Sequence, residues 1–265
     1  MRIVRFSPVT ADPSLKLGKD PLFGLLNADD TIAVIAGDPL YQGVNVVGKA
    51  VPLSQVRLLA PVLPRSKVVC IGKNYADHAK EMGGEVPAQP VIFLKPNTSV
   101  IGPGETIVWP AMSDRVDHEA ELAIVIGRIC KDVPKERVND VIFGYTLGND
   151  VTARNLQKID GQWTRAKSFD TFCPLGPWID TDFVPANQAI TATLNGEVKQ
   201  SAHLSDMIFD IPTIINFVSQ VMTLLPGDVI LTGTPAGIGP MPEKATITVA
   251  IEGLGELTNK VSTRG

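Results

Sequence analysis

The chain has 265 residues, enough for one large domain or two unequal ones, and 44% hydrophobic residues is an ordinary share for a globular protein. It carries 24 Lys and Arg against 28 Asp and Glu, which gives a net charge of −4 without a run of five or six like charges. Nucleic-acid binding needs a basic surface, so this composition argues against a nucleic-acid partner.

Cysteines and histidines are few and far apart. Cys70, Cys130 and Cys173 are odd in number and lack CxxC spacing, so we expect neither a disulfide framework nor a zinc knuckle. The 3 histidines are too dispersed for a histidine-rich metal site, so any metal must bind to carboxylates. Because no signal peptide or membrane-length apolar stretch is visible, we expect a cytoplasmic protein with no membrane partner.

The N-terminal residues predict a small β unit. Three short apolar runs favour strands: Arg2–Phe6, Leu22–Leu26 and Thr31–Ile35. The turn sequence Asn-Ala-Asp-Asp joins the last two runs into a hairpin. The proline-rich segment Ala60–Arg65 is the best candidate boundary. We therefore expect a small domain over residues 1–60 and a larger one over residues 61–265.

The remaining chain predicts mostly strands. They are Val68–Ile71, buried strands at Val91–Leu94 and Glu119–Ile126, a hairpin over Ala189–Lys199, and final strands at Val229–Thr232 and Thr246–Ile251. The predicted helices are Tyr75–Met82 with Asn74 as its cap, Asp132–Ile142, Val151–Ile159, and Ile211–Leu225 ended by Pro226-Gly227. Because strands and helices do not alternate regularly, the pattern indicates a β-dominated α+β fold.

The densest group of ionisable residues is the run Asp117–Glu121. Side chains two apart on a strand share a face, so Glu119 and Glu121 point the same way, about 7 Å apart. That face continues through Ala123 and Val125, so both carboxylates should be buried, where they repel each other and lose hydration. A hard cation such as Mg²⁺ or Mn²⁺ would remove both penalties. A solvent-facing strand end is the alternative.

A third carboxylate is available in Asp150, which lies in a turn between a predicted strand and a predicted helix. Its alternative role is to cap the helix N-terminus. Three protein carboxylates leave octahedral positions open for water and substrate, as a catalytic metal site requires.

Three further segments carry candidate side chains. His78 and Glu81 are neighbours on one helix, where the carboxylate would orient the imidazole as a general base, unless they are an inconsequential surface pair. Lys167 enters a loop-like segment and would stabilise an oxyanion or remain solvated. The glycine-rich turn Leu231–Gly239 lacks a nucleotide-loop pattern, but its N–H groups and Thr234 could hold a carboxylate.

In order and spacing, these segments resemble the fumarylacetoacetate hydrolase family over roughly the last 200 residues. The motifs that carry the resemblance are Gly72–His78, Phe93–Pro96, Asp117–Glu121, Gly148–Gln157, Lys167–Pro177, Asn195-Gly196 and Pro226–Gly239. The first 60 or so residues resemble the N-terminal unit of shorter bacterial members. The resemblance implies a mixed β-sandwich roll with a pseudo-barrel core, a homodimer, and a Mg²⁺ or Mn²⁺ site.

The resemblance also implies roles for single residues. The family's metal carboxylates match Glu119, Glu121 and Asp150; its His–Glu dyad, on a helix that can close as a lid, matches His78 and Glu81; its active-site lysine matches Lys167. The candidate substrate contacts are Gln157, Thr234, Lys95 and Arg154. The sequence departs from the family at Asn155, where members often carry an acid; the change would remove an ion pair beside the site.

We therefore expect a metal-dependent enzyme that cleaves the C3–C4 bond of acylpyruvate-type 2-oxo acids or decarboxylates oxaloacetate. The metal would chelate the substrate's C1 carboxylate and C2 carbonyl, His78 would activate water, and Lys167 would stabilise oxyanions. One alternative is a 2-hydroxyhepta-2,4-diene-1,7-dioate isomerase or 5-carboxymethyl-2-oxo-hex-3-ene-1,7-dioate decarboxylase of aromatic catabolism. Another is a non-catalytic oxyacid-binding protein. The dyad favours the hydrolase or decarboxylase, because an isomerase needs no activated water.

Overall fold

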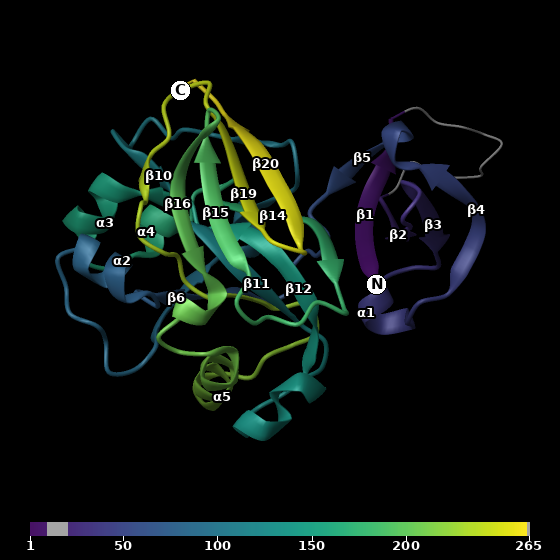
Figure 1. Cartoon of the computed structure of the whole chain (residues 1–265), viewed down its shortest axis with the longest axis horizontal. Coiled ribbons are helices and arrows are strands. Elements are labelled where there is room, and N and C mark those ends of the chain that lie inside the picture. The colour runs from purple at the N-terminus through teal and green to yellow at the C-terminus, as the bar shows by residue number, and fades with distance from the viewer. Residues whose placement is uncertain (10–20, 264–265) are drawn as a thin grey trace.

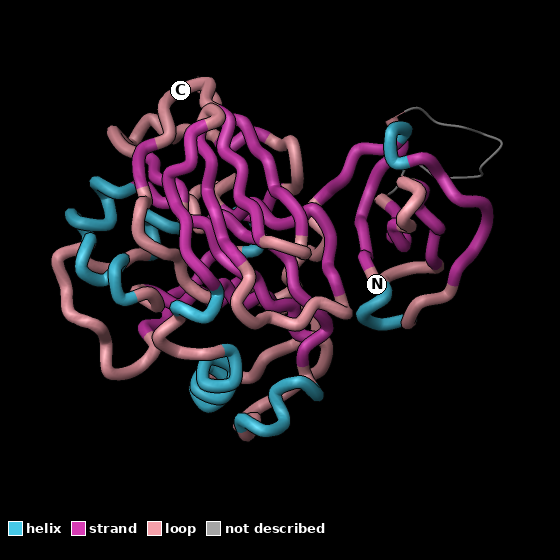
Figure 2. Tube along the Cα trace, in the orientation of Figure 1, coloured by secondary structure: helices cyan, strands magenta, loops and turns pink. Residues whose placement is uncertain are grey.

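A computed structural model of the chain describes residues 1–9 and 21–263. Figure 1 shows a large β-rich body with a smaller unit of strands β1–β5 and helix α1 beside it, and Figure 2 shows that strands dominate both parts. The predicted β-dominated α+β fold is confirmed. The division at residue 60 stays a prediction, since β1 of the small unit pairs directly with β14 of the large body.

The largest sheet has 12 strands, in the order β4-β3-β2-β1-β14-β12-β11-β17-β6-β7, with β5 paired to β1 and β8 paired to β14. Their bounds are β1 Arg2–Pro8, β2 Leu22–Leu26, β3 Thr31–Ile35, β4 Val46–Pro52, β5 Val56–Leu59, β6 Val68–Gly72, β7 Val91–Lys95, β8 Val100–Ile101, β11 Ala120–Ile126, β12 Ile142–Asn149, β14 Cys173–Asp180 and β17 Val229–Leu231.

Two smaller sheets complete the large body. One has the order β16-β15-β19-β20-β9 and the other the order β13-β10-β18. Their bounds are β9 Thr106–Ile107, β10 Val116–His118, β13 Thr152–Ala153, β15 Ala189–Leu194, β16 Glu197–His203, β18 Gly239–Pro240, β19 Thr246–Ile251 and β20 Gly255–Val261. The five-stranded sheet covers one face of the largest sheet, where their side chains form a shared apolar core.

Helices are short. The α-helices are α1 Pro39–Gln42, α2 Ala76–Glu81, α3 Arg154–Asp160, α4 Thr164–Lys167 and α5 Ile211–Val221. The 3₁₀ helices are η2 Leu53–Gln55, η3 Asn97–Ser99, η4 Lys135–Asp140 and η5 Leu204–Asp206. In Figure 1, α2, α3 and α4 gather on the side of the large body that lies away from the small unit. Within the described ranges, no helix is both long and apolar enough to cross a membrane.

Strand β11 lies at the centre of the core, and all seven of its residues are buried. Leu122 and Ile124 pack into the core shared with the five-stranded sheet. Ala123 and Val125 point to the opposite face, into a second cluster formed with strands β1, β6, β14 and β17. Because successive side chains of a strand alternate between faces and both faces are packed, residues 122–126 must all be apolar. Because β11 is packed on both faces, it holds the residues at its N-terminal end in a defined position.

Three predicted helices differ from those in the structure. The helix expected from Val151 begins only at Arg154, because Thr152 and Ala153 form strand β13 and pair with β10. Residues 132–134 do not open a helix: Asp132 has a left-handed φ of 51°, and the Asp132 and Val133 N–H groups donate to Ser219, so a 3₁₀ turn begins only after Pro134. Helix α5 ends at Val221 rather than Leu225, because the chain then extends and Leu224 exchanges two backbone hydrogen bonds with Cys130.

The predicted cap of helix α2 is also wrong. Asn74 makes no capping bond to α2. Its side chain instead donates to the carbonyls of Phe209 and Thr232 and accepts from the Phe209 N–H. Strand β7 is half-buried rather than buried, because it is the edge of its sheet and exposes Leu94. Among the longer strands, β4, β5 and β20 were not predicted, and β12 was implied only by the turn at Asp150. The segment Lys167–Pro177, expected to be loop-like, contains the end of α4 and the first half of β14.

The carboxylate of Asp228 joins strand β17 to the start of β6. It is fully buried and accepts hydrogen bonds from Ser66 Oγ, the Lys67 N–H, the Lys67 ammonium and the Leu225 N–H. We expect Asp228→Ala to lower the free energy of unfolding by about 2–4 kcal/mol, because these donors lose their acceptor. Urea titration measures this change.

The control for this prediction is Asp140→Ala, since Asp140 is exposed and pairs with Arg137. It should change the free energy of unfolding by less than about 1 kcal/mol. Equal effects of the two substitutions would contradict the role of Asp228.

Candidate active site

The register between strands β11 and β12 brings two carboxylates together. Ala120 pairs with Asn149. One residue beyond that pair, the Asp150 N–H donates to the Glu119 carbonyl at 2.9 Å, and the Glu119 N–H donates to Asn149 Oδ1 at 3.0 Å. Glu119, which interrupts the run from β10 to β11, is therefore held against Asp150 by backbone and side-chain bonds. Asp150 does not cap α3, whose N-cap is Ala153.

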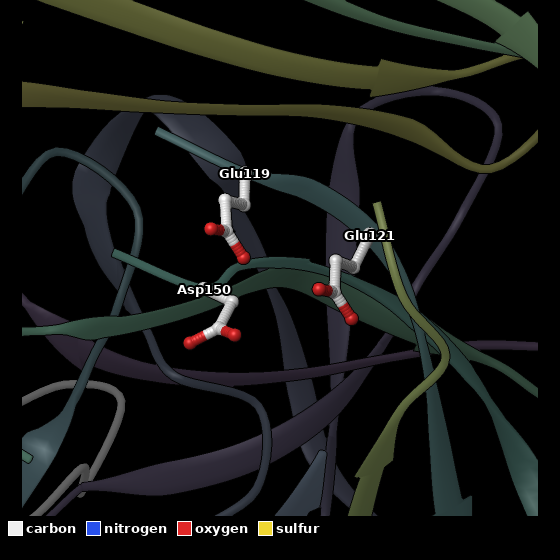
Figure 3. A group of neighbouring side chains, drawn as sticks. All are labelled: Glu119, Glu121 and Asp150. Carbon is white, nitrogen blue, oxygen red and sulfur yellow. The ribbon is translucent and has the colours of Figure 1, made fainter. Parts of the chain in front are cut away.

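Glu121 completes a group of three buried acids with Glu119 and Asp150. One carboxylate oxygen from each lies within 4.8 Å of the others, and Figure 3 shows the three side chains converging from two neighbouring segments. All three are at least 96% buried, with exposed fractions of 4%, 1% and 0% for Glu119, Glu121 and Asp150. Such a group needs positive charge nearby, because buried like charges repel.

Two lysines supply part of that charge. The Lys167 ammonium donates to Glu119 Oε2 at 2.8 Å and to Asp150 Oδ2 at 2.6 Å. The Lys95 ammonium donates to Asp150 Oδ1 at 2.6 Å and to the Val151 carbonyl. Burial acts to lower the pKa of Lys167, but the charges of Asp150 and Glu119 outweigh it and raise that pKa. Lys167 is therefore a proton-bearing donor rather than a base.

Arg154 links these acids to a fourth, Asp117. Its guanidinium donates to Asp117 Oδ2, to Gln157 Oε1 and, through Nη2, to Glu119 Oε1. Arg115 holds the same Asp117 carboxylate with two further bonds. Burial acts to raise the pKa of Glu119, but Lys167, Arg154 and His78 outweigh it and hold that pKa below its ordinary value. Glu119 is therefore ionised throughout the physiological range.

Glu121 differs from its two neighbours because no cation pairs with it among the residues described. Its recorded hydrogen bond comes from the Gly233 N–H at 2.6 Å. Burial, followed by the charges of Asp150 and Glu119, raises its pKa well above the ordinary value. A divalent cation bound by the three carboxylates would supply the missing charge, and oxygen donors are those that Mg²⁺ and Mn²⁺ prefer. The donor set thus fits such a cation.

His78 and Glu81 form a hydrogen-bonded pair on α2. His78 Nδ1 lies 3.1 Å from Glu81 Oε2, and the Gly237 N–H donates to the other carboxylate oxygen of Glu81 at 3.1 Å. A carboxylate accepts, so Nδ1 carries the proton and Nε2 presents its lone pair. His78 is buried. Glu81, itself bonded to the glycine-rich turn, therefore holds the His78 imidazole in one orientation.

Most of the site residues that the sequence predicts line one cavity. It is lined by Ile71, Gly72, Lys73, His78, Met82, Phe93, Glu119, Glu121, Asp150, Arg154, Gln157, Trp163, Lys167 and Thr234. Lys95 is not part of this lining, and its predicted contact with substrate stays a prediction. Its side chain is fully buried and bonded to Asp150, so its place in the structure is that of a support for a carboxylate. Glu81 likewise reaches the cavity only through His78.

The departure at Asn155 does not unpair Arg154. Asn155 Oδ1 accepts from Ser113 Oγ at 2.7 Å, while Asp117 and Glu119 pair with the guanidinium. The expected loss of an ion pair is therefore offset by these two acids.

Lys73, which lines the cavity, was not predicted as a site residue, and neither were two polar residues that bond to the lining from outside it. Asp117 is one of them, although it shares a strand face with Glu119 and Glu121, and that alternation could have identified it. Gln200 is the other: its side chain donates to Thr234 Oγ1. It lies 34 residues before Thr234, so no local pattern connects them.

Because no cation pairs with Glu121 among the described residues, this carboxyl group leads to a prediction about stability. In the metal-free protein its folded carboxyl keeps a proton that the unfolded chain releases above its ordinary pKa of 4.5, so stability falls as pH rises toward the raised folded pKa. We expect Glu121→Gln to remove this loss. With EDTA, its melting temperature should exceed that of the wild type more at pH 8 than at pH 5.

The same variant should lose the stabilisation that Mg²⁺ or Mn²⁺ gives the wild type, because a ligand that binds the folded state raises the melting temperature. Glu256→Gln, at an exposed position of β20, is the matched control and should behave like the wild type. An equal Mg²⁺-induced shift in Glu121→Gln and wild type would contradict the assignment.

Models of known protein families match both parts of the chain. The model of the fumarylacetoacetate hydrolase C-terminal family matches residues 67–262, and that of the Rv2993c-like N-terminal family matches residues 1–61. A mitochondrial oxaloacetate tautomerase, FAHD2A of Bos taurus, is 40% identical over 98% of this chain and 91% of its own.

Two solved structures extend the comparison. A 5-carboxymethyl-2-hydroxymuconate delta-isomerase from Mycobacterium smegmatis has a TM-score of 0.90 and 48% identity, with 100% of both chains covered. A maleylpyruvate hydrolase from Sphingobium sp. SYK-6, in complex with manganese(II) and pyruvate, has a TM-score of 0.80 and 32% identity, again with 100% of both chains covered. The mixed β-sandwich roll and the resemblance in the sequence are thereby confirmed, and the chain belongs to the fumarylacetoacetate hydrolase family, whose members are enzymes.

Proposed function

We propose that the protein is a divalent-metal-dependent enzyme that cleaves 2-oxo acids of the acylpyruvate type, including oxaloacetate, next to the C3 carbon. The observation that carries this proposal is the His78–Glu81 pair in the cavity that also contains the three carboxylates. An acidic metal site alone would suit a binding protein. A buried imidazole oriented by a carboxylate is the arrangement of a general base.

The cation would be held by Glu119, Glu121 and Asp150. Bound there, Mg²⁺ or Mn²⁺ would supply Lewis acidity toward the carboxylate and carbonyl oxygens of a 2-oxo acid. The proposal is supported by the uncompensated Glu121 carboxylate and by the manganese and pyruvate bound in the maleylpyruvate hydrolase relative.

The protein's own side chains then account for the proton movements. His78 Nε2 accepts a proton from water, and the water oxygen attacks the C4 carbonyl carbon. The C3–C4 bond breaks and its electron pair remains on C3. The proton held by His78 then passes to C3, which gives pyruvate and a second acid. With oxaloacetate, carbon dioxide leaves from C3 instead. Lys167 uses two of its three N–H donors on Glu119 and Asp150, so one is free for a developing oxyanion.

A second candidate is proton transfer at C3 without bond cleavage, as in a tautomerase or isomerase. It is favoured by the names of two relatives, the oxaloacetate tautomerase and the muconate isomerase. The same His78 could remove a C3 proton and return it. The two reactions differ in product, because tautomerisation releases no pyruvate.

The decisive assay follows pyruvate release from acetylpyruvate and oxaloacetate, and enol–keto conversion of oxaloacetate by its ultraviolet absorbance. We expect release with Mg²⁺ or Mn²⁺ and its loss with EDTA. His78→Ala should lower kcat for acetylpyruvate at least about 100-fold, because the attacking water loses its base. Its Mg²⁺ affinity, measured by calorimetry, should match the wild type.

His203→Ala is the control, since His203 is an exposed histidine and should be without effect. Pyruvate release that survives EDTA or His78→Ala would refute the cleavage mechanism. Enol–keto conversion without pyruvate release would select the tautomerase. Tight oxyacid binding without turnover would select a binding protein. The homodimer implied by the family resemblance stays a prediction, which light scattering of the purified chain would test.

A further inference from the structure

Gln200 is a buried amide on a strand that is otherwise mostly exposed. It lies on β16, where both of its neighbours in sequence, Lys199 and Ser201, are exposed, while its own side chain has no exposed surface. Burying an amide costs free energy unless each of its polar atoms is bonded. The position of this residue therefore needs an explanation in the groups that surround it.

Four groups surround the carboxamide. Oε1 accepts from the Ala120 N–H at 3.0 Å and lies 3.1 Å from His118 Nδ1. Nε2 donates to the Pro235 carbonyl at 2.8 Å and to Thr234 Oγ1 at 2.7 Å. A backbone N–H can only donate and a backbone carbonyl can only accept, so these two partners settle which end of the amide carries oxygen.

This orientation determines what Thr234 can offer. Its hydroxyl oxygen already accepts from Gln200 Nε2, so the hydroxyl proton must point elsewhere. No acceptor for that proton is recorded among the described residues, and Thr234 lines the cavity beside the three carboxylates. Its free interaction is therefore to donate a hydrogen bond into the cavity, toward an anionic oxygen.

The same amide also ties Thr234 to the carboxylates. Ala120 stands between Glu119 and Glu121, and its N–H is bonded to the oxygen end of Gln200. The nitrogen end holds both Thr234 and the Pro235 carbonyl. One buried side chain, hydrogen-bonded at both ends, thus connects the turn that carries Thr234 to the strand that carries the acids.

We infer that Gln200 is a positioning residue for substrate recognition: it commits the Thr234 hydroxyl to donate to the C1 carboxylate of the 2-oxo acid, in register with Glu119 and Glu121. This inference rests on the proposed function, because the anion is the substrate of that reaction. It assigns the carboxylate to the side of the cavity formed by residues 233–237. Gln200 itself does not touch the substrate.

A double-mutant cycle tests the inference. Gln200→Met has a similar shape without donors, and Thr234→Val removes the hydroxyl. Each should raise KM for acetylpyruvate about 10-fold or more, with kcat within about threefold, because a bond to the carboxylate is present before and during the reaction. In the Thr234→Val background, Gln200→Met should change KM by less than about twofold.

Two measurements separate positioning from a merely structural role. Calorimetric Mg²⁺ affinity of Gln200→Met should stay within about threefold of the wild type, whereas its affinity for oxalate, measured with Mg²⁺ present, should fall about 10-fold. The conservative Thr234→Ser should behave like the wild type. Gln220→Met, at an exposed position of α5, is the matched control.

Fully additive effects of Gln200→Met and Thr234→Val on KM would overturn the inference, as would equal losses of Mg²⁺ and oxalate affinity. If Gln200→Met does not fold, Thr234→Val with normal KM and oxalate affinity would overturn it alone, and a 10-fold loss restored by serine would support it. A wild-type enzyme that turns over no 2-oxo acid would refute the proposed function; the oxalate titrations would still test the role of Gln200.

Discussion

The pairing of β11 with β12 forces mutually repelling carboxylates into the core, and the surrounding structure compensates for that repulsion. The register places Glu119 against Asp150, and Glu121, the second residue of the buried strand β11, has an exposed fraction of only 1%. The cations that surround them come from β7, α3 and α4, so a strand 55 residues before Asp150 and two consecutive short helices after it meet at one strand end. The three acids therefore influence which segments pack around them, as well as the chemistry of the site.

The three carboxylates differ in how much positive charge lies next to them, and this difference indicates where a cation would bind. Glu119 and Asp150 each have ammonium or guanidinium partners, whereas Glu121 accepts one backbone N–H among the residues that the structure covers. A fold selected for stability alone would pair or remove such an acid. A divalent cation accounts for its retention, and the cavity formed by His78, Lys167 and Thr234 accounts for why a cation there would be catalytic rather than structural.

Much of this site could be predicted from the sequence, because several of its residues lie close together in the chain at spacings that predict a shared face. The i, i+2 spacing of Glu119 and Glu121 and the i, i+3 spacing of His78 and Glu81 each determine a shared face. Long-range contacts could not be predicted this way, because no sequence pattern connects Lys95 with Asp150 or Gln200 with Thr234. Helix ends failed for the same reason, since Asn74 and Leu224 take partners from distant segments.

The most direct test of the central claim is where a cation binds. Crystals grown with Mn²⁺ and oxalate would locate the metal by its anomalous scattering. We expect one strong peak bound by oxygens of Glu119, Glu121 and Asp150, with oxalate on the same ion and one of its carboxylates within hydrogen-bond distance of Thr234 Oγ1. A peak bound by other residues, or the Lys167 ammonium still bridging Glu119 and Asp150 with no peak between the three acids, would contradict this claim.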